Sequence, residues 1–465
     1  MILFKNFKIN REYYLYDTNS NKLVNIDFSS YEFIEHNFMN IKNNNLKHCN
    51  NLPLRKLQRK GLLLNNKISK IEHPLNPLLP SLLDRKLMML SLQVTQKCNL
   101  NCEYCQYSGL LYNNRRHTNL SMKKELAIQT VDFFLKHSVD NKSIYIGFYG
   151  GEPLIEFGLI KDITNYVLSL KLNRIVTFTI TTNGTLFDEN KIAFFVKNNF
   201  KISISLDGPQ NIHDSHRKDN KGEGSFLKVI RWVTYLKSKY PAFFEKNVIF
   251  NSVNYDHTNK QLISDFFIKN GYKVESILLS DFYSKREKSF SDNSIYEKYE
   301  KLKLILFLKG YKKFKSIFLS DFIFAKRIMN TMMLTNKNLP NVFHPSGPCI
   351  PGVKRLFVNV NGRFYPCERS NELSESLCIG NVDDGFNIIK IFELLNIAKI
   401  TEKECKNCWA IRFCYSCALS SVDSKTLEIS KEKRLSMCKY RKEKILKAFE
   451  MILWLQKLGC DWNEI

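Results

Sequence analysis

The chain has 465 residues, 44% of them hydrophobic and 25% charged, and its 70 Lys and Arg exceed 45 Asp and Glu to give a net charge of +25. This is enough apolar material for two to four structural units, and it excludes a disordered tail protein, a collagen-like chain and a disulfide-stapled miniprotein. The charge is compatible with a polyanionic partner, but lysines spread among Asn and Ile are more typical of a solvated surface.

The meaning of the 13 cysteines depends on the compartment in which the protein works. The N-terminal stretch MILFKNFKINREYYLY lacks the apolar region and the small-residue cleavage site of a secretory signal. No apolar run approaches the length of a membrane span. We therefore expect a cytoplasmic protein without a membrane partner, whose cysteines serve as metal ligands or catalytic groups rather than as disulfides.

Residues 1–88 form the first predicted unit. Segments 12–16 and 22–26 flank an Asp-Thr-Asn-Ser-Asn turn and predict a β-hairpin. A helix capped by Ser29 and a second helical piece over 54–60 follow, and a Pro-containing linker over 73–80 leads out of the unit. A hairpin with short helices resembles a small winged-helix module; an oligomerisation or lid domain is the alternative.

Residues 89–290 form the predicted core, in which strands and helices alternate. Strands are predicted at 89–95, 143–149, 174–181, 201–207, 246–253 and 274–279, with amphipathic helices such as 121–137 and 226–240 between them. Six such repeats imply an α/β fold with a parallel sheet, either doubly wound or a partial (β/α)6 barrel. Ligands of both folds bind at the carboxyl ends of the strands.

The remaining chain divides by composition into three parts. Residues 291–344 form a helical bridging region rich in Lys and Phe, residues 345–440 are dense in cysteine and short of long periodic elements, and residues 441–465 carry an amphipathic helix over 443–458. Because the middle part has few long elements, we expect metal rather than a hydrophobic core to hold it.

Cys98, Cys102 and Cys105 follow closely on the first strand of the core. The next cysteine is Cys349, so no fourth ligand is local, whereas a structural zinc site normally takes four protein ligands. A [4Fe–4S] cluster held by three cysteines leaves one iron open. Such an iron at the mouth of a β/α sheet would bind and activate a small molecule, which makes these cysteines the predicted catalytic centre.

This Cys-x3-Cys-x2-Cys spacing, with the aromatic Tyr104 before its last cysteine, resembles the cluster motif of the radical S-adenosylmethionine (SAM) enzymes. A Gly-Gly-Glu-Pro sequence ends the second strand and resembles the family motif that holds the methionyl amino group. The resemblance therefore implies that Gly150, Gly151, Glu152 and Pro153 bind SAM together with Tyr104. Glycines let a backbone approach a ligand closely, and a carboxylate pairs with an ammonium group.

Further matches follow at the next strand ends. Thr182 and Asn183 end the third strand and resemble the segment near the SAM ribose. Ser205 ends the fourth strand and Arg217 follows it; in relatives a Ser and an Arg at such positions contact the ribose and the methionyl carboxylate. Any one of these is compatible with an ordinary Asn-Gly or Asp-Gly turn, but their order at successive strand ends disfavours that interpretation.

The cysteine-rich part resembles the SPASM extension of peptide- and protein-modifying relatives, which holds two auxiliary iron–sulfur clusters. The family pattern assigns one cluster to Cys405, Cys408, Cys414 and Cys438 and the other to Cys349, Cys367 and Cys417. The chain departs from the pattern in having two residues rather than three between Cys414 and Cys417. His344, Cys378 or an open iron would complete the second set. A zinc ribbon is disfavoured because five residues are too few between its knuckles, and Cys49 and Cys460 lie outside every pattern.

The resemblance implies reductive cleavage of SAM to a 5′-deoxyadenosyl radical that takes hydrogen from a substrate. The order of the units resembles maturases of Cys-rich ribosomally synthesised peptides. It therefore implies a precursor peptide whose leader pairs with a sheet edge, thioether or related crosslinks, and an electron donor such as flavodoxin or ferredoxin. The alternatives are formylglycine formation by an anaerobic sulfatase maturase, which normally lacks the N-terminal module, and a zinc-dependent nucleic-acid-binding protein. The peptide-maturase interpretation involves no nucleic-acid partner.

Overall fold

A computed structural model of the chain describes residues 1–9, 11–43, 52–109, 113–254, 260–278, 294–310, 319–335, 338–345 and 349–460. Its centre is a curved sheet in which all six predicted core strands are present: β5 (Met89–Thr95), β6 (Ser143–Gly150), β7 (Ile175–Thr182), β8 (Lys201–Ser205), β9 (Val248–Asn254) and β10 (Val274–Leu278). Each strand pairs in parallel with the next, in the order β10-β9-β8-β7-β6-β5. The predicted end of the last strand at residue 279 lies outside the described residues.

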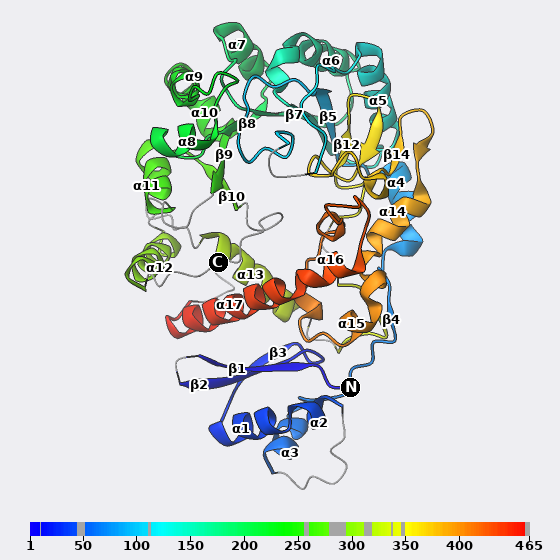
Figure 1. Cartoon of the computed structure of the whole chain (residues 1–465), viewed down its shortest axis with the longest axis vertical. Helices are drawn as coiled ribbons and strands as arrows, with labels where there is room; N and C mark the ends of the chain where they lie inside the picture. Colours follow the sequence, from blue (N-terminus) through cyan, green and yellow to red (C-terminus); the bar gives the residue numbers. More distant parts are fainter. Residues whose placement is uncertain are drawn as a thin grey trace.

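Helices cover the outer face of this sheet because parallel neighbours need crossover connections. They are α5 (Lys124–Lys136), α6 (Phe157–Ser169), α7 (Glu189–Lys197), α8 (Gln210–His216), α9 (Phe226–Lys239), α10 (Pro241–Asn247) and α11 (Lys260–Asn270). In Figure 1 they form an arc outside the strands, and each turns an apolar stripe inward, as α5 does with Val131 and Phe134. The result is the predicted α/β partial barrel.

The sheet continues beyond β5 into the cysteine-rich part. Strand β12 (Leu356–Val358) pairs in parallel with β5, and β13 (Arg363–Tyr365), β14 (Gly380–Asn381) and β15 (Gly385–Phe386) follow in antiparallel order, which gives a ten-stranded sheet. Phe357, Phe364 and residues of α14 (Ile388–Leu395) belong to the same buried core as the barrel. The expectation that metal rather than a core holds residues 345–440 is therefore wrong for residues 353–395.

The sheet of the N-terminal unit has one strand more than the predicted hairpin. The hairpin of β2 (Glu12–Asp17) and β3 (Lys22–Ile26) is confirmed, and β1 (Phe4–Ile9) adds to it in the order β1-β2-β3. Helices α1 (Phe28–His36), α2 (Phe38–Lys42) and α3 (Leu52–Arg59) pack on this sheet through a small core of its own. The predicted cap at Ser29 is wrong: the Asp27 carboxylate caps α1 by accepting from the Ser30 amide at 2.7 Å.

The predicted linker over 73–80 belongs to the folded body. It contains a 3-10 turn (Asn76–Leu78) and the start of α4 (Leu79–Arg85), whose Leu79 and Leu83 are buried in the main core. Just before it, β4 (Lys70–Ile71) pairs in parallel with β11 (Val342–Phe343). These contacts fix the path from the N-terminal unit to the barrel.

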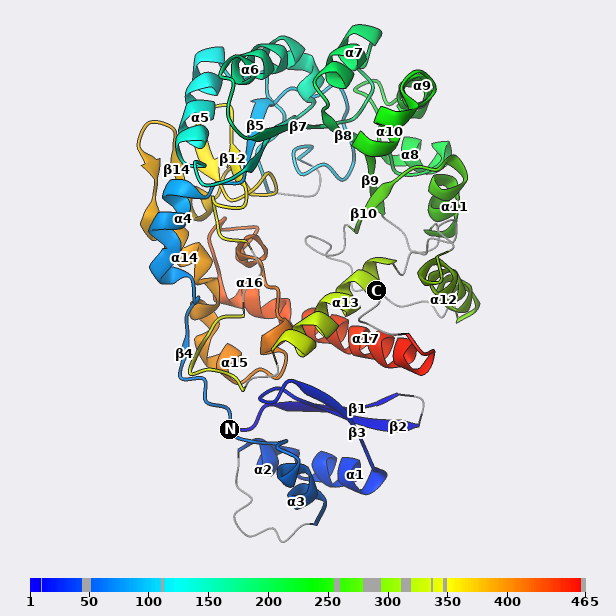
Figure 2. The same ribbon diagram turned by 180° about the vertical axis from the view of Figure 1, so that it is seen from behind.

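Helices join the two ends of the molecule. The predicted helical region contains α12 (Ser294–Leu308) and α13 (Leu319–Leu334), and the chain ends in α15 (Glu402–Lys406), α16 (Lys431–Ser436) and α17 (Cys438–Lys457). The last helix begins at Cys438, before the predicted start at residue 443. Figures 1 and 2 show α13 and α17 between the barrel and the N-terminal sheet. Within the described ranges, no helix is both long and apolar enough to cross a membrane.

Candidate active site and cysteine groups

The predicted catalytic cysteines lie in the loop that leaves the carboxyl end of β5. Cys98, Cys102 and Cys105 pack in one apolar group that also contains Leu100 and Tyr104. Burial raises the pKa of all three thiols, that of Cys102 to about 11. The thiols are therefore neutral by themselves at pH 7, and iron would bind them with release of protons. This donor set fits a cluster with one open iron.

A single metal ion suits the cysteines less well than a cluster does. In the described part of the chain, no three His, Cys, Asp or Glu side chains converge closely enough to hold one ion. Zn–S bonds of about 2.3 Å would draw the sulfurs of a tetrahedral site to within about 4 Å of one another. A four-iron cluster gives each cysteine an iron of its own and accepts wider spacing.

The structure separates the C-terminal cysteines into two groups. The first group consists of Cys405, Cys408, Cys414 and Cys438: besides burial, the nearby Cys414 raises the pKa of the other three thiols. The second group consists of Cys349, Cys367 and Cys417: besides burial, Cys417 raises the pKa of Cys367 and Cys349 raises that of Cys417, and Arg355 has both Cys349 and Cys367 as charged neighbours. This is the division that the family pattern implies.

The buried Arg434 lies beside the four-cysteine group and shows that this group suits an anionic centre. Its side chain is 2% exposed, and it donates to the hydroxyls of Thr401 at 3.1 Å and Ser416 at 2.7 Å. Burial lowers the pKa of Arg434, while Cys414 and Cys405 oppose that effect; its described partners include no carboxylate. A buried cation without a counter-charge is costly. Cluster-bound thiolates would supply that charge.

Neither His344 nor Cys378, the two candidate further ligands of the three-cysteine C-terminal group, makes a hydrogen bond to Cys367 among the described residues. His344 is buried, its Nε2 accepts from the Ala398 amide at 3.1 Å, and its charged neighbours are His73 and Arg434. The Cys378 thiol lies 3.5 Å from the carbonyl oxygen of Gly380 at the start of β14. The structure therefore gives no support to either residue as a ligand of the three-cysteine C-terminal group.

The two glycines at the end of β6, Gly150 and Gly151, meet protein backbone rather than open space. A Cβ atom on Gly150 would lie 2.3 Å from the carbonyl oxygen of Thr95, and one on Gly151 would lie 2.1 Å from that of Lys97. The amides of Gly151 and Glu152 donate to those two oxygens at 2.9 and 2.8 Å. The glycines thus let β6 approach the segment that leads into Cys98. This backbone contact is one reason for glycine at both positions, and their contact with SAM stays a prediction.

Glu152 joins the ends of β6 and β7. The side chain is fully buried; Oε1 accepts from the Thr182 hydroxyl at 2.6 Å, and Oε2 accepts from the Asn183 amide at 2.7 Å. Burial raises the pKa of Glu152 to about 7, although these hydrogen bonds oppose the shift. The structure therefore brings three predicted SAM residues into direct contact. Pro153, which follows, begins a 3-10 helix over Pro153–Glu156.

Arg217 and Tyr104 meet at a residue that the sequence analysis missed. Arg217 donates through Nε and Nη2 to the carboxylate of Asp207 at 2.9 and 3.1 Å, and the Tyr104 hydroxyl donates to the same carboxylate at 2.5 Å. All three are buried. The charge of Arg217 is thus paired inside the protein. The available signal was the place of Asp207 two residues after Ser205, which ends β8 beside Asn251.

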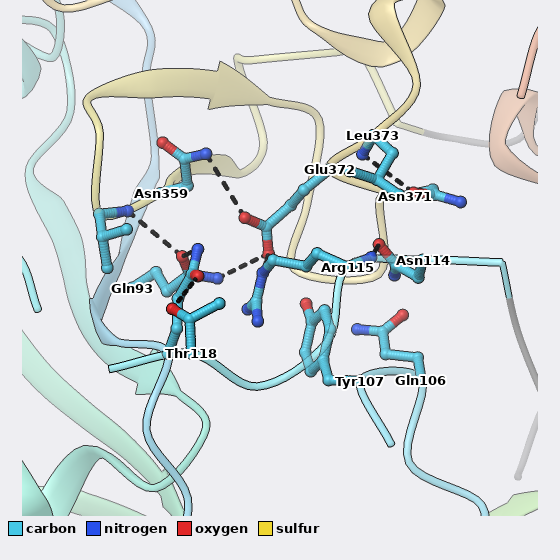
Figure 3. A network of polar contacts seen from close by, with 12 residues as sticks. Gln93, Gln106, Tyr107, Asn114, Arg115, Thr118, Asn359, Asn371, Glu372 and Leu373 are labelled. Carbon is cyan, nitrogen blue, oxygen red and sulfur yellow. Dashed lines mark hydrogen bonds and ion pairs between the residues drawn. The ribbon is translucent and has the colours of Figure 1, made fainter. Parts of the chain in front are cut away.

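A polar network ties the cluster loop to the segment after Cys367 (Figure 3). Glu372 accepts from Gln93 of β5 at 2.6 Å and from Arg115 Nε at 2.8 Å, and the Arg115 guanidinium carbon lies 3.8 Å from the centre of the Tyr107 ring. Within the described structure, Arg115 Nη2 and the Tyr107 hydroxyl have no hydrogen-bond partner. No sequence motif marks these residues.

A cavity of about 430 Å³ adjoins the cluster loop, and its lining includes Lys97, Cys98, Tyr107 and His117. Small-molecule sites usually have volumes of about 300–1,000 Å³. A ligand of that size therefore has room beside Cys98.

Known proteins share these features. The sequence pattern of the radical SAM superfamily matches residues 92–262. A cysteine-type anaerobic sulfatase-maturating enzyme of Clostridium novyi is 31% identical over 41% of this chain, which spans half of that relative. One of Clostridium perfringens is 28% identical over 70% of this chain and 87% of the relative. The radical SAM cyclopropyl synthase TigE of Paramaledivibacter caminithermalis is 24% identical over 72% of this chain and 68% of that protein.

A solved structure shares the fold. It is described as native anSMEcpe with bound AdoMet and Cp18Cys peptide, and it matches with a TM-score of 0.57 and 24% identity over 82% of this chain and 100% of that one. The superfamily pattern covers the three-cysteine loop, the Gly-Gly-Glu-Pro turn and the strand ends described above. The chain therefore belongs to the radical SAM superfamily, and it is an enzyme.

Proposed function

We propose that the protein is a peptide maturase that takes a hydrogen atom from a ribosomal precursor peptide and forms thioether or related crosslinks. The superfamily implies a [4Fe–4S] cluster and SAM, and Cys98, Cys102 and Cys105 are the proposed ligands. The observation that carries the peptide assignment is the N-terminal module of three strands and three helices attached to this core. The match spans the whole of the solved anSMEcpe chain but only 82% of this chain. This chain therefore has residues without a counterpart in that structure.

The cluster, when bound, supplies the electron that cleaves SAM to methionine and a 5′-deoxyadenosyl radical. The protein's part is binding and orientation. Glu152, held by Thr182 and Asn183, offers a buried carboxylate to the methionyl ammonium group. Arg217 opposes the effect of burial on the pKa of Cys102 and so favours the thiolate that binds iron. Ser205 stands at the same carboxyl edge, where we propose that it contacts the ribose.

The two C-terminal groups are proposed to hold two auxiliary clusters of SPASM type. The three-cysteine C-terminal group adjoins the active-site loop: Gln106 Nε2 donates to the carbonyl oxygen of Glu368, next to Cys367, at 3.2 Å, and the charged neighbours of the partly buried Tyr149 include both Cys105 and Cys367. A substrate peptide between these two sites would lie within reach of both. An iron without a fourth protein ligand would bind a substrate thiolate there.

The module is proposed to bind the leader of the precursor peptide through strand β3. Among the described residues, β3 pairs with β2 on one side only. An extended peptide can add a strand to such an edge. Helix α3 carries exposed basic side chains; hydrogen bonds from Ser30 chiefly lower the pKa of Asp27, which directly follows β3, and the nearby Lys56 adds to this effect. This positive charge beside the edge favours an acidic leader.

Anaerobic reconstitution is the first test. We expect about twelve irons per chain, four in each of three clusters, and formation of 5′-deoxyadenosine from SAM with a flavodoxin, a ferredoxin or a chemical reductant. Replacing Cys98, Cys102 and Cys105 by Ala should abolish this product. Turnover by that triple variant would contradict the assignment.

Sulfatase maturation is the second candidate function, and the names of the two clostridial relatives favour it. Mass spectrometry of a Cys-containing peptide separates the two. A thioether crosslink removes about two mass units and keeps the sulfur in a form that alkylating reagents cannot reach, whereas formylglycine made from Cys loses the sulfur. Membership of an enzyme superfamily contradicts the third alternative, a nucleic-acid-binding protein without catalytic activity.

A further inference from the structure

The turn between β2 and β3 is inserted into the C-terminal part of the molecule. Its socket is the knuckle loop, defined as residues 409–413, which separates two members of the four-cysteine group. Arg412 donates through Nε to the carbonyl oxygen of Thr18 at 2.7 Å and through Nη2 to the next carbonyl of the turn at 2.9 Å. The Thr18 hydroxyl donates to the carbonyl oxygen of Trp409 at 2.7 Å. Three hydrogen bonds thus join the turn to the knuckle loop.

Aromatic packing surrounds these hydrogen bonds. Tyr16 is 0% exposed, and its ring centre lies 5.3 Å from that of Phe413 in the knuckle loop. The same ring lies 5.0 Å from the ring of Phe449 on α17. Helix α17 begins at Cys438, the last member of the four-cysteine group. The two segments that pack against Tyr16, the knuckle loop and α17, therefore each adjoin a cysteine of that group along the chain.

A second set of contacts lies beside Cys405. Asn66 donates from Nδ2 to the carbonyl oxygen of Lys406 at 2.9 Å, and Lys406 Nζ donates to that of Ser69 at 2.7 Å. The residues that hold the N-terminal module are thus next to, or between, members of the four-cysteine group. This is the group whose buried cation, Arg434, lacks a carboxylate among its described partners.

The turn itself is built in advance. The carboxylate of Asp17 is buried and accepts from the amide of Ser20 at 2.8 Å and from that of Leu63 at 2.8 Å. The knuckle loop has a 3-10 turn over Ile411–Phe413, and its buried Ile411 and Phe413 pack in apolar clusters that Cys405 and Cys408 border. Irregular segments of this kind take their geometry from a bound metal centre. The turn is therefore fixed by hydrogen bonds from within its own unit, whereas the loop depends on neighbours that include cysteines of the four-cysteine group.

We propose that the four-cysteine group anchors the N-terminal module to the enzyme, so that loading this group with its cluster orders the knuckle loop and docks the β2–β3 turn. The inference rests on the proposed iron–sulfur occupancy of these cysteines and goes beyond the proposed leader binding. The cluster joins Cys405, Cys408, Cys414 and Cys438 and thereby removes the conformational freedom of the loop between them. Loss of this cluster releases the module, because Cys408 borders the apolar clusters that contain Tyr16 and Ile68.

Hydrogen exchange in the full-length, anaerobically reconstituted protein tests the proposal. Three variants are compared with the parent: Cys408→Ala with Cys414→Ala, Arg412→Ala, and a matched control that removes two ligands of the other group, Cys367→Ala with Cys417→Ala. Both double variants should lose about four irons per chain. Amides of the turn over 17–21 should exchange at least about tenfold faster in the first two variants, because a docking contact is lost, and at the parental rate in the control.

Arg412→Ala keeps every cysteine, so it separates docking from cluster assembly. Its iron content should equal that of the parent, and Arg412→Lys, which retains one donor group, should restore part of the protection. Parental exchange in a Cys408→Ala, Cys414→Ala protein that has lost four irons would overturn the proposal and leave the proposed function standing. Equally fast exchange of the 17–21 amides in the control would also overturn the proposal. So would an unchanged iron content in both double variants, and that result would contradict the proposed auxiliary clusters as well.

Discussion

The barrel and the four-cysteine region, residues 401–438, differ in the kinds of side chain that they bury. The largest fully buried side chains of the barrel are aromatic, such as Phe134, Phe148 and Phe250. Between residues 401 and 438, the buried side chains include not only Ile411 and Phe413 but also hydroxyls and the cation Arg434 beside cysteines. An apolar core stabilises long elements without help, whereas a polar interior of short elements needs a partner for its charge. The barrel should therefore keep its fold without iron, and the four-cysteine region should not.

The cysteines of the active-site loop give the sharpest test of this contrast. Replacing Cys98, Cys102 and Cys105 by Ala should abolish formation of 5′-deoxyadenosine and remove about four irons per chain. Because the loop leaves from a strand held by the apolar core, the far-ultraviolet circular dichroism of the barrel should stay unchanged. Chromatography of the nucleoside and an iron assay measure the two quantities. A collapse of the secondary structure would show that the barrel also depends on its metal.

The buried pair of Asp207 and Arg217 is the exception within the barrel. Asp207→Asn leaves the guanidinium without its carboxylate and should lower the free energy of unfolding by about 3–5 kcal/mol. The double variant Asp207→Asn, Arg217→Met should recover much of this loss because it removes the unpaired charge as well. Urea unfolding of the iron-free proteins gives both values. Equal stability of the single and double variants would argue against the ion pair.

Glu152 makes the barrel depend on pH. Its folded pKa of about 7 lies above the ordinary Glu value of 4.5, so the folded protein binds the proton more tightly than the unfolded chain does. Stability is therefore greatest below the unfolded pKa and falls as pH rises through about 4.5 to 7, by about 3 kcal/mol in total. Glu152→Gln should remove this fall, as urea midpoints at pH 5 and pH 8 would show. A parental pH profile in the variant would assign the effect to another group.

Binding of SAM should show the opposite dependence on pH at Glu152. The carboxylate is the form that attracts the methionyl ammonium group, so affinity should rise as pH passes through about 7. Calorimetric titration of the reconstituted protein with SAM between pH 6 and pH 8.5 measures this rise. Glu152→Gln should bind weakly and with little change over the same range. A pH-dependent affinity in that variant would mean that another residue controls binding.

The smallest predicted effect concerns the N-terminal module, which has a core of its own. Asp27→Ala removes the side-chain acceptor for the Ser30 amide and should cost about 1 kcal/mol of local stability. Faster hydrogen exchange confined to α1 would measure it, with Ser29→Ala as the matched control. A larger effect at Ser29 would return the cap to the residue that the sequence suggested.

The sequence by itself determined the strands and helices of the barrel and the residues at its carboxyl edge. Period-two and period-3.6 patterns are local, so all six strands were predicted to within about two residues of their observed ends. The three-cysteine loop and the Gly-Gly-Glu-Pro turn were found because their chemistry requires fixed spacings along the chain. The same holds for Glu152, Thr182 and Asn183, which end neighbouring strands and therefore meet.

Only the tertiary structure decided which distant residues become partners. Gln93, Arg115 and Glu372 form one network although they come from three separate segments, and no local pattern marks any of them. The close approach at Gly150 is to protein backbone, which a sequence match to a binding motif does not reveal. The docking of the β2–β3 turn on residues 409–413 joins opposite ends of the chain. Such contacts depend on how complete elements pack, and packing is decided by shape and burial in three dimensions rather than by spacing along the sequence.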